Sequence, residues 1–395
     1  MKFSYIISAF SILFLSYWIY TILYEIDVIK TVEETNVNDI DCYKVKHSLP
    51  IEDFVKINET FLIGSSFNVP ELFHDLKYLT EKTLKNDMMI SFNLESEDQE
   101  KVRFVPLVNF PEKVPFHPHG MDLMDEEFIY VINHSFSSKI SNERVELFRI
   151  RFDGGSNEPV KLLYIRSFLL PRSFFGTLNA IAGIDQSSFY FTTSGSATMP
   201  LGASQNNLFY RLKYVLSVPF CVIFNLKFTA AFHFKEGEIT AIKETAGIMN
   251  NGIIYDKENK RLFVAQTLDK KLIELDTKNG ERKPTVVKVV KSQHGYDNIY
   301  YDKSKQKIYG TIIPKLYQFT EVVEYYKRNK RVDLKGIYGG FQSIDLKNDY
   351  IIKIEHISTN KLNLISSATY FNDGKAQILT SSMDNGLLVC RVRMK

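Results

Sequence analysis

The sequence predicts an all-β fold, a six-bladed β-propeller, preceded by one N-terminal transmembrane helix. Short β-type runs separated by turn residues recur through the chain, and no stretch after residue 30 keeps a long helical period. Aromatic residues make up 13% of the chain, including 30 Phe and 22 Tyr, as suits pleated, half-buried strands. The N-terminus is instead one apolar stretch. We therefore divide the 395 residues into an anchor and its flank, 1–30, and a propeller, 31–395.

Residues 3–24 carry no charge and predict an uncleaved signal anchor. A helix of this length rises about 33 Å, enough to cross the hydrocarbon core of a bilayer. The stretch exceeds the apolar core of a signal peptide, and no clear small-residue cleavage site follows it. A cleaved signal and a buried soluble helix are the alternatives. Lys2 precedes the stretch while Glu25 and Asp27 follow it, which places the propeller in the ER lumen or the extracellular space.

The charge balance argues against a nucleic-acid partner. The 49 Lys and Arg nearly match the 46 Asp and Glu, and no segment has a clustered basic run.

Export would expose the three cysteines to an oxidising compartment. Cys42 lies near the start of the exported part and Cys390 near its end, so a bond between them would join the ends of a closed structure. Cys221 lies in an apolar run and is expected to be a buried or membrane-facing thiol. The sequons at Asn58 and Asn133 agree with export, although such triplets also occur by chance.

A loose repeat predicts the six blades. Six times, a polar or small pair precedes an apolar strand by about nine to twelve residues, and successive pairs lie 46 to 72 residues apart. This spacing suits one four-stranded blade per copy, with a β-sandwich and chance spacing as the alternative. The pairs are Glu52-Asp53, His119-Gly120, Asn179-Ala180, Asn251-Gly252, Asp297-Asn298 and Ser367-Ala368.

The polar residues of these pairs predict a cation site. The innermost strand of each blade lines the central channel, so polar residues entering that strand can converge there. Carboxylates and amides without cysteine suit a hard cation with six to eight oxygen ligands, which favours calcium over zinc. Buried carboxylates would also repel one another without such a cation. The alternative for each residue is an ordinary turn Asn or Asp.

The chain resembles the paraoxonase/arylesterase family through short motifs that keep their order from about residue 40 to 391. They are Leu-Pro-Ile-Glu-Asp (49–53), Phe-His-Pro-His-Gly (116–120), Val-Ile-Asn-His (131–134), Thr-Leu-Asn (177–179), Met-Asn-Asn-Gly (249–252) and Tyr-Asp-Asn-Ile (296–299). The resemblance implies two calcium ions, hydrolysis of lactones and aryl esters, and a disulfide between Cys42 and Cys390. It implies a catalytic calcium held by Glu52, Asn179, Asn251, Asp297 and Asn298.

The resemblance also assigns His119 as the base that activates water and His134 as its partner. The second calcium would use Asp53 and the backbone oxygen of Met121. Its third ligand, an Asp in the family, is Ala180 here, which leaves one calcium expected and a second in doubt. An accessory Asp-His pair of the family is replaced by Ser194-Gly195.

Residues 207–224 resemble the family's membrane-seeking helix near the active-site mouth. They are strongly apolar, and Pro219 would interrupt a helix, so a blade strand with its loop is the alternative.

We expect calcium-dependent hydrolysis of aryl esters or lactones. Calcium would polarise the carbonyl while His119 and His134 activate water. The alternative is a catalytically weak or silent member that assists the folding or assembly of membrane proteins. A third reading is an unrelated propeller that binds ligands.

Overall fold

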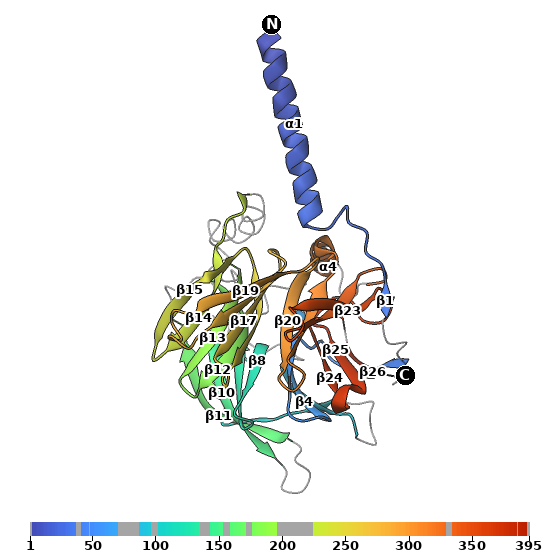
Figure 1. Cartoon of the computed structure of the whole chain (residues 1–395). Helices are drawn as coiled ribbons and strands as arrows, with labels where there is room; N and C mark the ends of the chain where they lie inside the picture. The colour runs from blue at the N-terminus through green and yellow to red at the C-terminus, as the bar shows by residue number, and fades with distance from the viewer. Residues whose placement is uncertain are drawn as a thin grey trace.

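The computed structural model describes residues 2–36, 41–46, 48–69, 87–95, 102–134, 143–152, 159–170, 176–195, 224–328, 334–384 and 386–392. Its strands form six antiparallel sheets arranged around a common axis, so the six-bladed prediction is confirmed (Figure 1). The apolar strand predicted after each pair is the second strand of its blade, for example at 128–133 and 261–266.

The first three blades follow one another along the chain. The first contains β3 (Asp53–Lys56), β4 (Phe61–Ser66), β5 (Met88–Asn93) and β6 (Arg103–Phe104). The second contains β8 (Pro118–Met124), β9 (Phe128–Asn133), β10 (Arg144–Phe152) and β11 (Pro159–Leu169), with β7 (Leu107–Val108) at its outer edge. The third contains β12 (Thr177–Asp185), β13 (Ser188–Gly195), β14 (Thr229–Lys235) and β15 (Glu238–Gly247).

The last three blades include both short N-terminal strands. The fourth contains β16 (Asn250–Asp256), β17 (Arg261–Gln266), β18 (Lys271–Asp276) and β19 (Thr285–Lys291). The fifth contains β20 (Gly295–Asp302), β21 (Lys307–Ile313), β22 (Gly339–Asp345) and β23 (Ile351–Ser358), with β1 (Thr35–Asn36) at its edge. The sixth contains β24 (Ser367–Phe371), β25 (Ala376–Thr380), β26 (Leu387–Arg391) and β2 (Asp41–Lys44), and a 3₁₀ turn, η3 (Asn372–Gly374), joins its first two strands.

Turn residues at the hairpins explain why the strands reverse where they do. Glu236 and Gly237 form the two-residue loop between β14 and β15, and both have positive φ, 52° and 85°. This conformation matches the twist of the flanking strands, and glycine adopts it without a steric penalty.

Apolar side chains fill the spaces between neighbouring blades. One cluster joins the third and fourth blades through Tyr190, Ile253 and Leu262, and another joins the sixth and first blades through Phe54 and Ile378. Burying each large side chain stabilises the fold by about 1.5–3 kcal/mol. The core is therefore a ring of inter-blade layers, and each inner strand is held by the blades on both sides.

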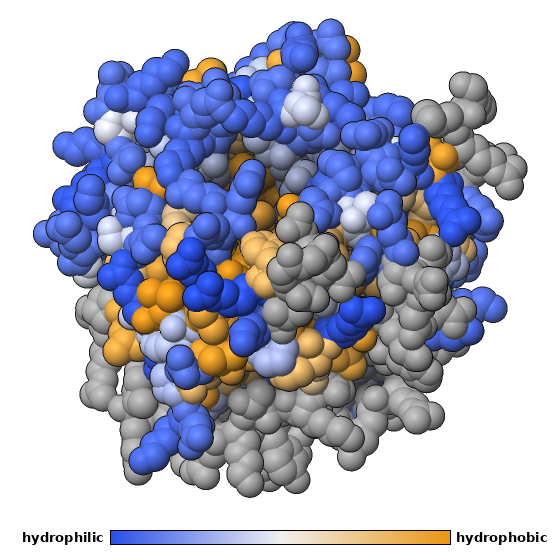
Figure 2. Space-filling view, turned by 90° about the horizontal axis from the view of Figure 1, so that it is seen from below, coloured by the Kyte–Doolittle hydropathy of each residue, from blue (hydrophilic) through white to orange (hydrophobic). Residues whose placement is uncertain are grey.

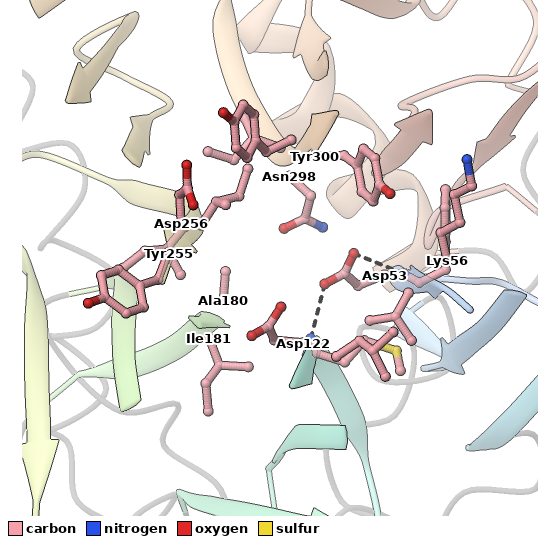
Figure 3. A pocket seen from close by; sticks show the side chains of 18 of the residues that line it. Asp53, Lys56, Asp122, Ala180, Ile181, Tyr255, Asp256, Asn298 and Tyr300 are labelled. Atoms are coloured by element: carbon pink, nitrogen blue, oxygen red, sulfur yellow. Dashed lines mark hydrogen bonds between the residues drawn. The ribbon is translucent and has the colours of Figure 1, made fainter. Parts of the chain in front are cut away.

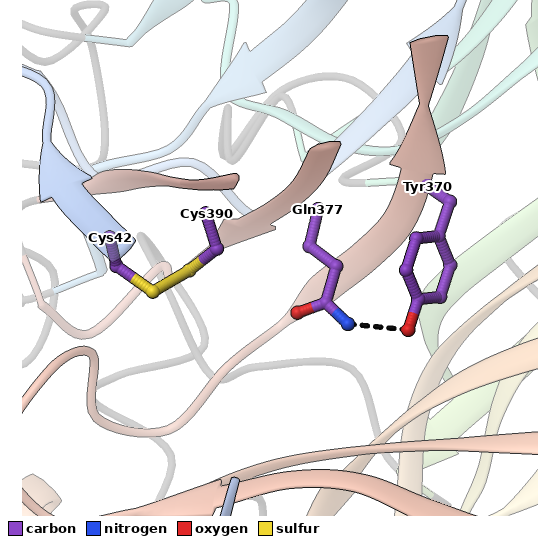
Figure 4. The surroundings of a disulfide bond; sticks show 4 residues. All are labelled: Cys42, Tyr370, Gln377 and Cys390. Atoms are coloured by element: carbon purple, nitrogen blue, oxygen red, sulfur yellow. Dashed lines mark hydrogen bonds between the residues drawn. A yellow bond between two sulfur atoms is a disulfide. The ribbon is translucent and has the colours of Figure 1, made fainter. Parts of the chain in front are cut away.

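The chain ends meet in the sixth blade. Strand β2 pairs with β26, and Cys42 lies opposite Cys390, to which it is disulfide-bonded across a sequence separation of 348. Gln377 is the register partner of Cys390 on β25, and its amide donates to the hydroxyl of Tyr370 on β24, 2.5 Å away (Figure 4). A row of side chains thus crosses all four strands of the closing blade.

The N-terminal segment forms a helix, α1 (Lys2–Glu25), that projects from one face of the propeller (Figure 1). We expected residues 3–24 to cross a membrane. Among the residues whose side chains the structure describes, no helix is long and apolar enough to do so.

A buried ion cluster attaches the end of α1 to the propeller. Asp27 is 0% exposed, and its Oδ1 lies 2.7 Å from both Lys30 Nζ and Lys270 Nζ. Lys270 Nζ also donates to the backbone oxygen of Glu25, 2.7 Å away. A charge removed from water is stable only when it is paired and hydrogen-bonded, so this cluster holds α1 to the fourth blade.

A second helix covers the same face. Helix α4 (Leu316–Arg328) lies between β21 and β22, and Tyr317 N–H donates to the backbone oxygen of Ile26, 3.1 Å away. Its apolar side, including Val322 and Tyr326, packs on Phe67, Ile313 and Met383.

The disulfide yields a stability prediction. We expect Cys42→Ala with Cys390→Ala to lower the free energy of unfolding by about 2–5 kcal/mol, because the bond closes a very long loop and so restricts the unfolded chain. Urea unfolding followed by circular dichroism measures this change, and a reducing agent should reproduce it in the unmodified chain. Cys221→Ala is the control. An equal loss in that variant, or no loss in the double variant, would contradict the closing role of the bond.

Candidate functional site

The six predicted pairs lie at the start of the six inner strands, on the face that carries α1 and α4. Each inner strand runs from this face toward the opposite one, and in four blades its pairing with the second strand is interrupted at the predicted pair. The register breaks fall between Pro118 and Met121, Leu178 and Ile181, Asn250 and Ile253, and Tyr296 and Ile299. A bulge of this kind re-aims the side chains within it. The same distortion therefore recurs at the same place in successive blades.

The re-aimed side chains meet one another near the axis. His119 Nε2 lies 3.6 Å from Glu52 Oε1 and 3.4 Å from Asn179 Nδ2. These two contacts connect the second blade to the first and to the third. Asn251 Nδ2 donates to Asp297 Oδ1, 2.7 Å away, which joins the fourth and fifth blades.

The backbone of Glu52 completes the ring. Its carbonyl oxygen accepts from Asn298 Nδ2 at 3.2 Å and from Ser367 Oγ at 3.3 Å. The structure thus brings together all five residues expected around the first calcium.

Close packing of the inner strands allows this convergence. A Cβ added to Gly120 would lie 2.2 Å from the backbone oxygen of Asn179, and one added to Gly252 would lie 2.7 Å from Ile299 N. Only glycine fits at these two positions, because real Cβ atoms do not approach backbone atoms so closely.

The carboxylates of this ring repel one another. Burial raises the pKa of Asp297 well above its ordinary value, and the negative charges of Glu52 and Asp53 raise it further. The Asp297 side chain is half-buried. Its ionised form would be stabilised by a cation between the two carboxylates.

Two amide oxygens point to the same conclusion. Asn179 Oδ1 and Asn251 Oδ1 are buried and have no hydrogen-bond partner in the described part of the chain. Buried oxygens left without a partner are costly, and a hard cation would satisfy them. No three His, Cys, Asp or Glu side chains in the described ranges lie close enough to hold a metal by themselves. The donor set is therefore a mixed one of carboxylates and amides, which fits calcium.

A second layer lies one residue further along the inner strands. Asp53 Oδ2 accepts from Met121 N–H at 3.0 Å, and Asp53 Oδ1 accepts from Ser367 Oγ at 2.8 Å and from Phe54 N–H at 2.9 Å. Burial raises the pKa of Asp53 to about 7. The methyl group of Ala180 contributes no ligand to this layer. Because Asp53 already has three donors, the second layer is a poorer cation site than the first.

This layer borders a cavity of about 540 Å³ (Figure 3). Asp53, Asp122 and Asn298 point toward its centre, and hairpin residues such as Lys257 and Lys303 line its mouth. Since those hairpins join the far ends of the inner strands, the cavity opens on the face opposite α1. Polar side chains cover most of that face, and apolar ones gather toward its centre (Figure 2).

Asp122 is a residue that the sequence argument missed. Its Oδ2 accepts from Gly183 N–H at 2.7 Å, and burial raises its pKa to about 7. It lies on β8 two residues past the register break, so the alternation after a bulge was needed to place it.

Both predicted histidines lie at the first layer and are neutral at physiological pH. Their ring centroids are 4.8 Å apart. Burial lowers the pKa of His119 to about 4, an effect that His134 strengthens and Glu52 opposes. Burial also lowers the pKa of His134 to about 3, with His117 adding to the effect.

An apolar layer covers the histidines from the side of α4. The ring of Phe67 contacts those of His119 and His134, with centroids 5.7 and 5.8 Å away, and packs in the cluster that contains α4. This layer shields the imidazoles from water on that side.

Asn133 is not a glycosylation site in the folded chain, contrary to the sequon prediction. It is 0% exposed, its amide donates to Pro115 O and Glu146 Oε1 at 3.0 Å, and its oxygen accepts from His117 N–H at 2.9 Å. A glycan has no room there. Asn58 is exposed, so its sequon stays a prediction.

The predicted segment 207–224 lies outside the described residues except for Phe224, whose ring contacts that of Trp18 on α1. Cys221 also lies outside them.

Several solved structures share the fold at low sequence identity. The major allergen Mala s 1 of Malassezia sympodialis is 10% identical, with a TM-score of 0.50 over 89% of this chain and 95% of that one. A luciferin-regenerating enzyme is 10% identical, with a TM-score of 0.49 over 90% and 96%. A gluconolactonase from Xanthomonas campestris is 10% identical, with a TM-score of 0.45 over 92% and 99%. At these identities the likeness concerns the fold alone.

No curated protein is significantly similar to the chain in sequence. The model of the family described as Arylesterase, however, matches residues 57–329, which include both histidines and four of the five expected ligands. This match confirms the resemblance seen in the short motifs. The chain belongs to the arylesterase family.

Proposed function

We propose that this protein is a calcium-dependent hydrolase of aryl esters and lactones. The observation that carries the proposal is the ring of oxygen atoms that five residues from four blades place beside two neutral histidines in ring contact. Membership of the arylesterase family supports the reaction class. One calcium is proposed, at the first layer, because Ala180 removes a ligand from the second.

The residues of the first layer would hold the ion. Glu52 and Asp297 provide negative charge, while Asn179, Asn251 and Asn298 provide neutral amide oxygens. A calcium ion bound there supplies positive charge that polarises a substrate carbonyl and stabilises the oxyanion formed when water attacks.

His119 would accept the proton of the attacking water. It is neutral, lies beside Glu52 and Asn179, and its ring packs against that of His134. The negative charge of Glu52 favours the imidazolium that forms, which compensates in part for the burial of the ring.

The disulfide supports export. A bond that joins the two ends of the propeller persists in an oxidising compartment, so we propose that the propeller resides in the ER lumen or outside the cell. We keep the N-terminal segment as a proposed membrane anchor on the strength of its uncharged apolar sequence.

Hydrolysis tests the proposal directly. The full chain with calcium should hydrolyse phenyl acetate and a δ-lactone, and EDTA should abolish turnover. We expect His119→Gln to lower kcat by about 10²–10⁴-fold, the usual contribution of a general base.

His356→Gln is the matched control, since burial lowers the pKa of His356 to about 4 as it does for His119, but His356 lies on β23 of the fifth blade, next to the edge strand. It should retain activity. A folded chain that binds calcium and hydrolyses neither substrate would overturn the hydrolase and favour the assembly-partner alternative.

The amide ligands can be tested through stability. Asn251→Ala should lower the melting temperature strongly in calcium and only slightly in EDTA, because a ligand acts through the bound ion. Asn250→Ala is the control. Asn250 is also buried, but its side-chain amide forms hydrogen bonds with Thr229 and Gln266. Asn250→Ala should therefore lower the melting temperature by the same amount in both buffers. Equal losses for Asn251→Ala would exclude it as a ligand.

Asp297→Asn should change the melting temperature in opposite directions in EDTA and in calcium. In EDTA it should raise the melting temperature, because it removes a buried carboxylate repelled by Glu52 and Asp53. In calcium it should lower the melting temperature, because it removes a charged ligand. A decrease of the same size in both buffers would show that the charge of Asp297 is not compensated by calcium.

A further inference from the structure

Three histidines gather beneath Phe67, and two of them are paired with buried carboxylates. The rings of His117, His119 and His134 all lie within 6.4 Å of the Phe67 ring centroid. His134 Nδ1 lies 2.9 Å from Glu143 Oε2, and His117 Nδ1 lies 2.5 Å from Asp87 Oδ2. The proposed reaction uses His119 and His134 but gives no role to either carboxylate.

Glu143 occupies a position that connects the histidines to the ligand ring. It is 3% exposed, and His134 is 2% exposed. Burial raises the pKa of Glu143 well above its ordinary value, and the nearby backbone N–H of Leu178, the residue before Asn179, opposes this shift. The Glu143 side chain therefore lies against two parts of the site: the ring of His134 and the start of β12, the strand that carries Asn179.

Glu143 lies at the entry to β10, directly before Arg144, whose register partner is Asn133 on β9. Asn133 precedes His134, and its side chain is fixed by bonds to Pro115 and Glu146. The backbones that carry Glu143 and His134 are therefore paired and rigid. A side-chain bond between rigid supports holds its geometry without a further entropic cost.

We infer that Glu143 is a positioning residue for the proposed hydrolysis: it accepts the Nδ1–H of His134, fixes the tautomer and plane of that ring, and thereby sets the place of His119. The inference rests on the proposed function for its catalytic consequence, but not for the structural one.

The chemistry follows from the tautomer. An imidazole whose Nδ1–H donates to a carboxylate has Nε2 free as an acceptor, and the carboxylate also stabilises any positive charge that the ring gains. Without this bond, the buried ring can rotate or change tautomer beneath Phe67. Its contact with His119 would then no longer be fixed, and the base would spend less time in its reactive orientation.

The pair of Asp87 and His117 provides a matched control. Both side chains are buried, and the bond again joins a histidine Nδ1 to a carboxylate oxygen. The ring of His117 also packs against Phe67. Asp87→Asn therefore reproduces the loss of a buried carboxylate beside a buried histidine, in a pair that the proposed reaction does not use.

Kinetics of the full chain in calcium test the catalytic consequence. We expect Glu143→Gln, which keeps the shape and removes the charge, to lower kcat for phenyl acetate by about 10–100-fold, a part of the usual contribution of a positioned base. KM should change less than about twofold, because Glu143 does not contact the substrate. Asp87→Asn should change kcat by less than about threefold. Equal losses in the two variants would overturn the inference.

Nitrogen NMR of the full chain with ¹⁵N-labelled histidine tests the positioning itself, whether or not the protein hydrolyses esters. His134 is assigned from the spectrum of His134→Gln. We expect a single tautomer with a protonated Nδ1 in the unmodified chain and in Asp87→Asn, and a mixture of tautomers in Glu143→Ala. A spectrum of His134 that is the same in Glu143→Ala as in the unmodified chain would overturn the inference.

The two failures are distinguishable. The proposed function would be overturned if the unmodified chain showed no turnover. If Glu143→Ala nevertheless gave a mixture of His134 tautomers, Glu143 would still be the residue that positions His134. An active chain that tolerates Glu143→Gln would overturn the inference and leave the function.

Discussion

The repulsion between carboxylates held on the propeller axis is the constraint on which the rest of the structure depends. Glu52 and Asp297 come from different blades, and each inner strand is fixed by apolar layers on both sides. Neither side chain can move away without disturbing that packing. Together with the partnerless oxygens of Asn179 and Asn251, they favour a bound positive charge, and within the described ranges no lysine or arginine forms an ion pair with Glu52 or Asp297.

Closure of the propeller sets this ring. The pairing of β2 with β26 and the bond between Cys42 and Cys390 hold the first blade against the sixth. Only then can the backbone oxygen of Glu52 accept from both Asn298 and Ser367. A covalent bond at the outer edge of one blade thus stabilises contacts on the axis, because the blades form a continuous ring.

The two halves of the axis differ in chemistry. The half near α1 and α4 combines the oxygen ring with dry, neutral histidines beneath Phe67. The other half is a cavity with Asp53 and Asp122 near its inner end. The cluster of Asp27 and Lys270 attaches α1 to the first of these faces, so α1 and the candidate site share one side of the molecule.

The sequence by itself determined the repeat, and with it the blades, the inner strands and the oxygen-bearing residues that start them, because these depend on local alternation and on spacing along the chain. It also determined that Ala180 weakens a second layer. Only the tertiary structure decided that Asn133 is buried, that Asp122 points into the cavity, that burial keeps both histidines neutral, and that the Glu143 side chain lies against His134. These features depend on bulge positions and on contacts between blades, which bring together residues far apart in sequence and change the polarity around them. No local pattern records either effect.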